Sequence, residues 1–186
     1  MLWLLEEIGG PYDLTEISAT QRRSQEHLLR HPLGRVPALH LPDGATMFES
    51  AAICLQLADL NPGAGLIGPV GSTGRGLVYQ WVVFAVSELE APLFRWIREL
   101  GERVVDAPAH DRFADAAAAM QSVLAERDWL VDDRFSVADV LCATVLQGAN
   151  ARGLLEPWPA LEAYVQRGEA RPAYARAAVI SDRPRS

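Results

Sequence analysis

Residues 31–59 read "HPLGRVPALHLPDGATMFESAAICLQLAD", and this stretch decides the fold of the first third of the chain. Two short apolar runs, "ALHL" and "TMF", flank the Pro-Asp-Gly of "LPDGA", which is typical of a hairpin turn. The apolar residues that follow predict a helix from about Ser50 to Leu60. The sequence therefore predicts a β-hairpin that leads directly into a helix.

The residues before this hairpin alternate between short helical and extended patterns. The opening "MLWLLEEIGG" predicts about two turns of helix that stop at Gly9-Gly10, but no capping residue precedes them. "YDLTEI" at 12–17 is a possible strand, and residues 21–30 form a polar helix. Because the first helix has a stop and no start, we expect the natural reading frame to begin upstream of Met1 with a strand, a loop and the first helical turns.

A glycine-rich stretch divides the chain. Residues 61–76, "NPGAGLIGPVGSTGRG", carry six of the 14 glycines and two prolines, enough to halt any regular element. We therefore expect an α/β domain over 1–62, a linker over 63–74, and an all-helical domain over 75–186.

The first helix of the second part carries two apolar stripes. One contains Trp81, Phe84 and Trp96, and it predicts the helical core. Val78, Val82 and Val86 form a second stripe, for which two explanations stay open: a homodimer interface, or deep burial within one bundle. Pro92 predicts a kink in the same helix.

Two further helices are predicted at about 108–130 and 136–152. The second begins with a capping box made of Ser136 and Asp139, with Phe135 placed to pack on Val140. Pro159 opens another helix, and a last short helix begins at Arg171-Pro172. These signals concern folding and not chemistry.

Composition excludes several classes of function. Seventeen basic residues, all arginine, against 24 acidic ones give a net charge of −7, the wrong sign for a general binder of nucleic acid or anionic membranes. Cys54 and Cys142 stand alone in apolar helical segments, which predicts buried packing in a reducing compartment. We find no signal peptide and no stretch long enough to span a bilayer, so we expect a cytoplasmic protein.

The motifs and their order resemble the glutathione transferase family. The family pattern NPxGxVPAL is met as "HPLGRVPAL" at 31–39, and "ES" follows at 49–50. "LLEEIGGPYDL", "FSVADV" and "RPAYARA" also resemble family segments, in the family's order. The resemblance implies a thioredoxin-like N-terminal domain, here with its first strand missing, followed by the family's all-helical C-terminal domain.

The resemblance also implies a glutathione site at Val36, Pro37, Glu49 and Ser50. A cis Val36-Pro37 bond would present the Val36 amide and carbonyl to the cysteinyl backbone of glutathione, as a strand would. The helix start at Ser50 would bind the γ-glutamyl carboxylate, and Glu49 would accept from the ammonium of the same group. The alternatives are a rigid turn at Val36-Pro37 and a simple helix cap at Ser50.

No catalytic residue can be assigned. In the family a Tyr, Ser or Cys near the first strand activates the glutathione thiol, and that region would precede Met1, so we expect the given chain to be inactive. We expect glutathione as cosubstrate, a hydrophobic electrophile near Trp81, Phe84, Trp96 or Arg95, and no metal, since no clustered His and Cys occur.

Two functions follow from the resemblance. The first is a glutathione S-transferase that passes glutathione to an electrophilic small molecule in detoxification, as a homodimer. The alternative is a noncatalytic module of the same fold that binds glutathione or another protein. The Glu49-Ser50 pair favours the first, because an interaction module has no need to recognise glutathione.

Overall fold

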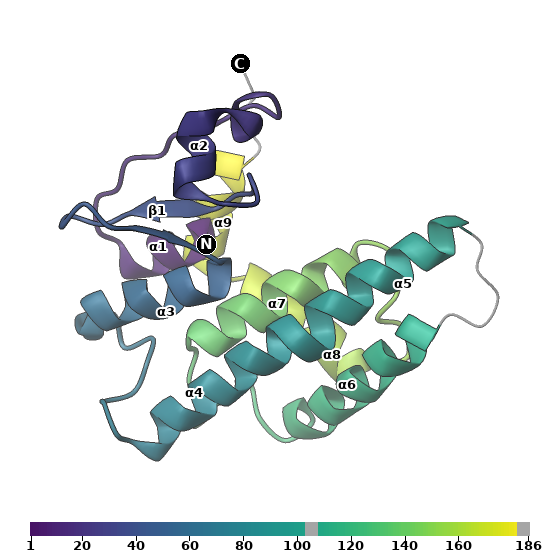
Figure 1. The fold of residues 1–186 in the computed structure, drawn as a ribbon. Helices are drawn as coiled ribbons and strands as arrows, with labels where there is room; N and C mark the ends of the chain where they lie inside the picture. Colours follow the sequence, from purple (N-terminus) through teal and green to yellow (C-terminus); the bar gives the residue numbers. More distant parts are fainter. Residues whose placement is uncertain (103–107, 182–186) are drawn as a thin grey trace. The chain divides into compact units, whose positions relative to one another are not determined.

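The structure, a computed structural model, describes residues 1–102 and 108–181. The chain forms two compact units, one made of residues 1–64 with the segment from Pro172 onward, the other of Gly65–Arg171 (Figure 1). An α/β part is followed by a helical part, as predicted. The last helix differs from the predicted boundaries: it lies within 75–186, yet it belongs to the first unit.

The first unit combines short helices with one small sheet. Its elements are α1 (Leu2–Ile8), η1 (Gln21–Arg23), α2 (Gln25–Arg30), β1 (Ala38–His40), β2 (Thr46–Phe48), α3 (Ser50–Leu60), η2 (Pro62–Ala64) and α9 (Pro172–Ser181). Among the described residues the sheet has two strands, and β1 pairs with β2 in antiparallel register, Ala38 opposite Phe48. Gly44, at a φ of 87°, supplies the turn. The predicted hairpin and the helix after it are confirmed.

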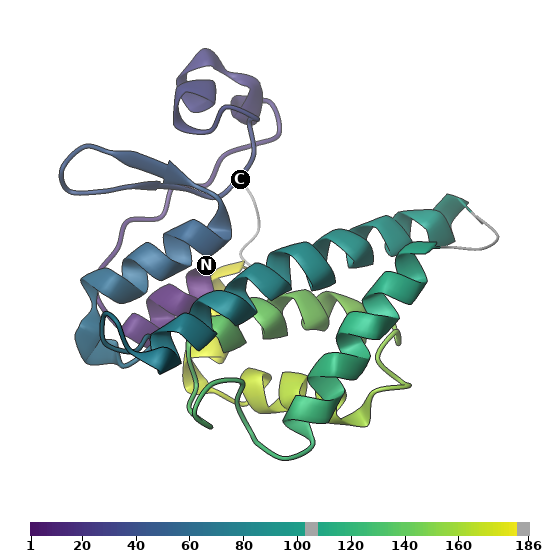
Figure 2. The same cartoon turned by 60° about the horizontal axis from the view of Figure 1, so that its bottom comes forward.

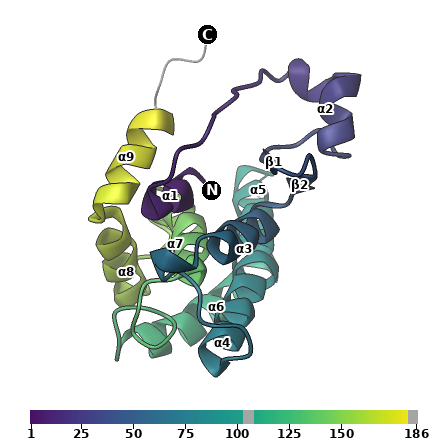
Figure 3. The ribbon, with the colours of Figure 1, turned by 90° about the vertical axis from the view of Figure 1, so that its left-hand side faces the viewer.

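Helix α1 packs against α9, the last described helix, and Figure 3 shows the two side by side. The Trp3 and Tyr174 rings meet edge to face with centroids 5.2 Å apart. Arg176 donates from Nε to Glu6 Oε2 and from Nη2 to the Glu6 carbonyl, each at 2.8 Å. These contacts hold α9 in the first unit. Gly9, at a φ of 73°, ends α1 as predicted.

Residues 12–17 do not form the strand that we predicted. They belong to an extended, irregular segment that runs from α1 to η1 (Figure 3). A strand exists only where a neighbouring strand supplies hydrogen-bond partners, and none of the described residues lies beside this segment as a strand. Tyr12 Oη still anchors the segment by donating to Glu6 Oε1 at 2.8 Å.

The second unit is helical. Its elements are α4 (Thr73–Phe84), the π-helical η3 (Ala85–Glu90), α5 (Ala91–Glu102), α6 (Pro108–Leu124), α7 (Val137–Asn150) and α8 (Pro159–Glu169). Elements α4, η3 and α5 form one continuous helical run, with α6 packed against α5 (Figure 2). The predicted helix 108–130 ends earlier, at Leu124.

A π-helical stretch takes the place of a simple proline kink. Helix η3 ends at Glu90, two residues before Pro92. In an α-helix the ring of Pro92 would clash with the carbonyl four residues earlier. The wider π-helical turn gives the ring room, so the run continues through the proline.

Helix α7 lies at the centre of the second unit and packs against α4, η3 and α8. The predicted capping box at its start is confirmed: Asp139 Oδ2 accepts from the Ser136 amide at 2.8 Å and from Ser136 Oγ at 3.0 Å. Burial raises the pKa of the Asp139 carboxyl, although hydrogen bonds from Leu130, Tyr164 and Ser136 act in the opposite direction. Cys54 and Cys142 are free and buried, and burial raises the pKa of both thiols.

The stripe of Val78, Val82 and Val86 is partly buried and partly exposed. Val78 and Val82 are 2% and 3% exposed, so they belong to the core of the second unit. Of the two explanations left open, burial is correct for them. The exposed large apolar side chains of the same helical run include Tyr79, Val83, Val86 and Phe94, with Leu100 near the end of α5.

The expectation that no stretch could span a bilayer is also corrected. The run Thr73–Glu102 is long and apolar enough to cross a membrane by length and composition alone. The helical core of a soluble protein passes the same test. Leu89 and Leu93, within this run, are buried in the second unit, at 0% and 3% exposure.

Candidate functional site

Val36-Pro37 lies in the loop between α2 and β1, and its peptide bond is cis. The Val36 side chain is exposed. Within the part of the chain that the structure describes, neither the amide nor the carbonyl of Val36 has a hydrogen-bond partner. One donor and one acceptor are therefore available side by side to an extended peptide.

Two histidines and a glycine hold this loop. His27 Nε2 lies 2.8 Å from the Arg35 carbonyl oxygen, and His31 Nδ1 accepts from the Leu33 amide at 3.3 Å. Both imidazoles are buried. Gly34 has a φ of 61°, and a Cβ there would lie 2.6 Å from the Arg22 carbonyl oxygen, so only glycine fits.

Glu49 connects β2 to α3 with an unusual backbone. Its φ of 70° and ψ of 112° lie in a region that residues with a side chain rarely adopt. Its side chain is exposed, and among residues 1–102 and 108–181 its carboxylate has neither an ion pair nor a hydrogen bond. A strained backbone that presents an uncompensated charge is typical of a binding residue.

Ser50 is the first residue of α3, and Glu49 occupies the capping position. The Ser50 hydroxyl caps nothing, and it makes no hydrogen bond to any described residue. The first intrahelical bond runs from the Ile53 amide to the Glu49 carbonyl at 3.0 Å, which leaves the amides of residues 50–52 without helical partners. The structure thus disfavours the helix-cap alternative for Ser50.

The strand register brings the predicted residues to one end of the hairpin. Ala38 lies opposite Phe48. Val36-Pro37 directly precedes β1, and Glu49-Ser50 directly follows β2, so the two pairs flank the open end of the hairpin. The Phe48 ring also packs on His31, with centroids 5.0 Å apart. The loop before β1 and the start of α3 therefore lie at the same end of the hairpin.

The groups at this site suit a peptide with a zwitterionic end. The amides at the start of α3 and the Ser50 hydroxyl can donate to a carboxylate, which the helix dipole also stabilises. The Glu49 carboxylate can accept from an ammonium beside it. In the described residues no group of three or more His, Cys, Asp or Glu is placed to hold a metal ion.

The aromatic residues that we expected beside an electrophile are mainly packing residues. Trp81 and Trp96 are 9% and 8% exposed. The Trp96 ring contacts Phe113, with centroids 5.5 Å apart. Arg95 donates to Glu99 Oε1 at 2.8 Å. Phe84 is half-buried, and its ring packs edge to face on Trp81 with centroids 5.1 Å apart.

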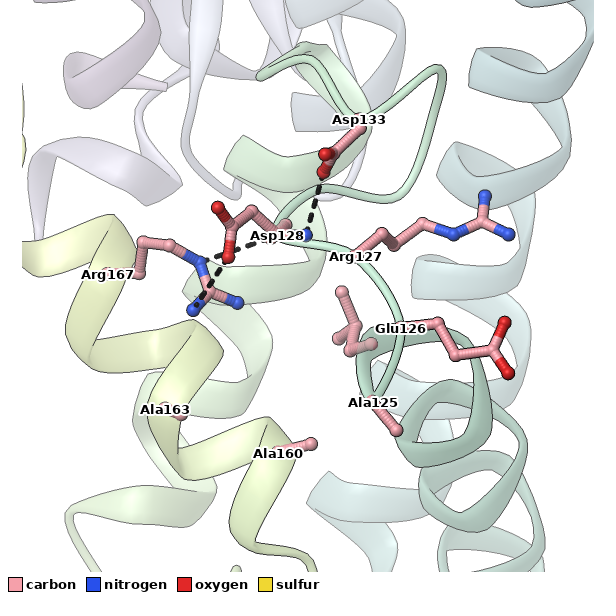
Figure 4. A pocket seen from close by; sticks show the side chains of 9 residues that line it. Ala125, Glu126, Arg127, Asp128, Asp133, Ala160, Ala163 and Arg167 are labelled. Carbon is pink, nitrogen blue, oxygen red and sulfur yellow. Dashed lines mark hydrogen bonds and ion pairs between the residues drawn. The ribbon is translucent and has the colours of Figure 1, made fainter.

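A separate hollow in the second unit lies between the end of α6, the loop after it and α8 (Figure 4). Its polar groups bind one another: Arg167 Nη1 lies 3.3 Å from Asp128 Oδ1, and Asp133 Oδ1 accepts from the Asp128 amide at 2.7 Å. Glu126 and Arg127 extend away from Arg167 in Figure 4. We therefore treat this hollow as structural.

Sequence reasoning missed His27 and His31 as parts of the site. Their separation of four residues, with His27 on the predicted helix and His31 directly after its end, was the available signal. The bond from His27 to Arg35 spans eight residues and depends on how the loop folds back on α2, which periodicity does not reveal.

Two family models match the chain. "Glutathione S-transferase, N-terminal domain" matches residues 1–60, and "Glutathione S-transferase, C-terminal domain" matches residues 91–172. The first match contains Val36, Pro37, Glu49 and Ser50.

Two glutathione S-transferases are similar to this chain over most of their length, and one elongation factor over a smaller part. Glutathione S-transferase GstA of Escherichia coli O157:H7 is 32% identical, over 90% of this chain and 86% of its own. A sphingomonad glutathione S-transferase, solved in complex with glutathione, superposes with a TM-score of 0.86 at 29% identity, over 98% of this chain and 93% of its own. Elongation factor 1-gamma 3 of Oryza sativa subsp. japonica is 27% identical, over 78% of this chain but 36% of its own.

Proposed function

Because the chain belongs to the glutathione S-transferase family, we propose that it binds glutathione at the end of the β1–β2 hairpin and transfers it to a hydrophobic electrophile. Val36 binds the cysteinyl backbone, while Glu49 and Ser50 bind the γ-glutamyl group. The predicted domain 1–62 contains all of these residues.

One observation carries this proposal. The exposed carboxylate of Glu49, on a strained backbone, directly precedes the free amides at the start of α3. A simple turn needs neither the strain nor the charge. The γ-glutamyl group of glutathione carries an ammonium and a carboxylate on one carbon, and it matches this acceptor and these donors.

The transfer itself follows from thiol chemistry. The thiolate sulfur attacks an electrophilic carbon and forms a C–S bond, while a leaving group departs or a conjugated double bond takes up a proton. The thiol proton passes to solvent or to a base. We assign no residue of the chain to thiol activation, and the described residues at the site supply binding groups.

A noncatalytic binding module is the second candidate. It is favoured by the similarity to elongation factor 1-gamma 3, whose name is not that of a transferase. Such a module would bind glutathione and leave the rate of its conjugation unchanged.

Calorimetry with two ligands tests the binding mode. We expect the intact chain to bind glutathione at least tenfold more tightly than glutaryl-cysteinylglycine, which lacks only the ammonium, because about 1.5 kcal/mol or more is lost with a charged hydrogen bond. In Glu49→Gln the two ligands should bind alike. Glu16→Gln, which removes the same charge from an exposed position of the same unit, should keep the discrimination. Absence of binding at millimolar glutathione would refute the proposal.

A conjugation assay then separates the two candidates. Formation of the thioether from glutathione and a chromogenic aryl halide should exceed the uncatalysed rate if the chain is a transferase. Binding without acceleration, under conditions that saturate the site, assigns the noncatalytic role.

We also propose a homodimer that works in the cytoplasm, without metal, nucleic acid or membrane. The surface involved is the exposed stripe of Tyr79, Val83, Val86 and Phe94, which are 40%, 64%, 40% and 64% exposed. Four large apolar side chains at helical spacing on one run are costly to leave in water. The net charge of −7 disfavours anionic partners.

A further inference from the structure

In the Arg35–Val36 peptide group, the carbonyl has a hydrogen-bond partner, whereas the N–H has none among the described residues. His27 Nε2 lies 2.8 Å from the Arg35 carbonyl oxygen. A carbonyl can only accept, so Nε2 carries the proton and donates.

The direction of the Arg35 carbonyl determines the direction of the Val36 N–H. A peptide group is planar, and its N–H points opposite to its C=O. A donor that holds the Arg35 carbonyl therefore also sets the direction of the Val36 N–H. Because His27 draws the carbonyl toward α2, the N–H is turned away from α2, toward the exposed side of the loop.

His27 is itself firmly held. It lies on α2, its side chain is buried, and its amide donates to the Ser24 hydroxyl that caps the helix, at 3.2 Å. Its ring stacks on that of His31, with centroids 6.5 Å apart, and His31 in turn contacts Phe48. This chain of rings connects α2 to the residue directly before Glu49.

We propose that His27 is a positioning residue for the glutathione site: through the Arg35 carbonyl it aims the Val36 amide at the cysteinyl carbonyl of glutathione. The inference rests on the proposed function and adds a residue that does not touch the ligand. It also explains why a buried polar side chain stands on α2 at this position.

Two substitutions separate positioning from packing. His27→Phe keeps an aromatic ring and removes the donor, whereas His27→Gln keeps an N–H donor at similar reach. We expect the Kd for glutathione to rise about five- to tenfold in His27→Phe, from the loss of one oriented hydrogen bond, and to stay within about twofold of wild type in His27→Gln. His40→Phe, at an exposed histidine of β1, should leave the Kd unchanged.

The free protein gives a second readout. The backbone amide resonance of Val36 should shift in His27→Phe and return toward its wild-type position in His27→Gln. A wild-type Kd in His27→Phe, or equal weakening in both variants, overturns the inference. If wild-type protein binds no glutathione, the proposed function fails, and the Val36 resonance alone then decides whether His27 positions the amide.

Discussion

Glu49 has a φ of 70° at the point where the chain passes from β2 into α3. Such a conformation costs on the order of 1 to 3 kcal/mol and persists only where the surroundings fix it. The hairpin register fixes one side, and the first hydrogen bond of α3, from Ile53 to the Glu49 carbonyl, fixes the other. This strained backbone conformation occurs at the residue directly before α3, so the carboxylate lies next to the start of the helix.

Replacing Ser50 by Ala tests the anion contact. Since the hydroxyl makes no hydrogen bond to the described residues, the free energy of unfolding should stay within about 0.5 kcal/mol of wild type. The Kd for glutathione should rise about tenfold or more. Ser122→Ala, on the exposed face of α6 in the second unit, is the control for the Kd measurement. An unchanged Kd in folded Ser50→Ala would remove Ser50 from the site.

Gly34→Ala should destabilise the first unit. The new Cβ would lie 2.6 Å from the Arg22 carbonyl oxygen, and a φ of 61° adds about 1 to 2 kcal/mol for any residue with a side chain. We expect a loss of about 2 kcal/mol or more in urea unfolding. Gly63→Ala has open space at its Cβ and should change stability little. Equal stability of the two variants would contradict the tight approach of this loop to η1.

At the scale of elements, the pair Glu6 and Arg176 joins α1 to α9. Hydrogen bonds from Arg176 and Tyr12 lower the pKa of Glu6 below its ordinary value of 4.5. The folded state therefore binds this proton less readily than the unfolded state. The pair stabilises fully above about pH 4.5, and its contribution is lost as the pH falls through the lowered pKa.

Amide exchange in α9 measures this contribution. Between pH 6 and pH 3.5, the protection of α9 in wild type should fall toward that of Glu6→Gln, which lacks the charge at every pH. At pH 6 the free energy of opening of α9 should be about 1 kcal/mol higher in wild type than in Glu6→Gln. The value is small because Arg176 is half exposed to solvent. Glu16→Gln serves as the control. A difference that does not narrow on acidification would show that the pair is not what holds α9.

Elements with local signals were predictable from sequence, and elements set by distant partners were not. The turn at residues 42–44 and the capping box at Ser136 and Asp139 carry their signals within a few residues, and both were found. Residues 12–17 have the composition of a strand but lack a neighbour. Pro92 indicated a distortion, and only packing decides that it becomes a π-helical stretch.

The candidate site also combines residues that a local motif predicts with features that depend on distant contacts. Val36, Pro37, Glu49 and Ser50 were predicted through a motif, and the β1–β2 pairing brings the two pairs to the same end of the hairpin. The φ of Glu49 and the bond from His27 to Arg35 follow from the folded path of the backbone. A helical stripe likewise does not reveal which side faces the core, and for this reason an interface and burial both stayed open for Val78 and Val82.

For the whole molecule, the exposed stripe predicts self-association. Val83→Glu should convert a dimer to a monomer in sedimentation velocity, because it places a charge in an apolar contact at 64% exposure in the single chain. Val179→Glu makes the same change at an exposed valine of α9 and should leave the dimer intact. A monomeric wild type at micromolar concentration would contradict the proposed interface.

The contact between α1 and α9 also has a consequence during synthesis. Glu6 and Arg176 are 170 residues apart, and at roughly 5 to 20 residues per second a ribosome needs on the order of ten seconds or more to make the chain between them. Throughout that time Trp3 and the face around it lack the helix that covers them. The nascent chain therefore exposes an apolar surface to chaperones until α9 has been made, and a chain cut short before Pro172 has a first unit without the helix that packs on α1.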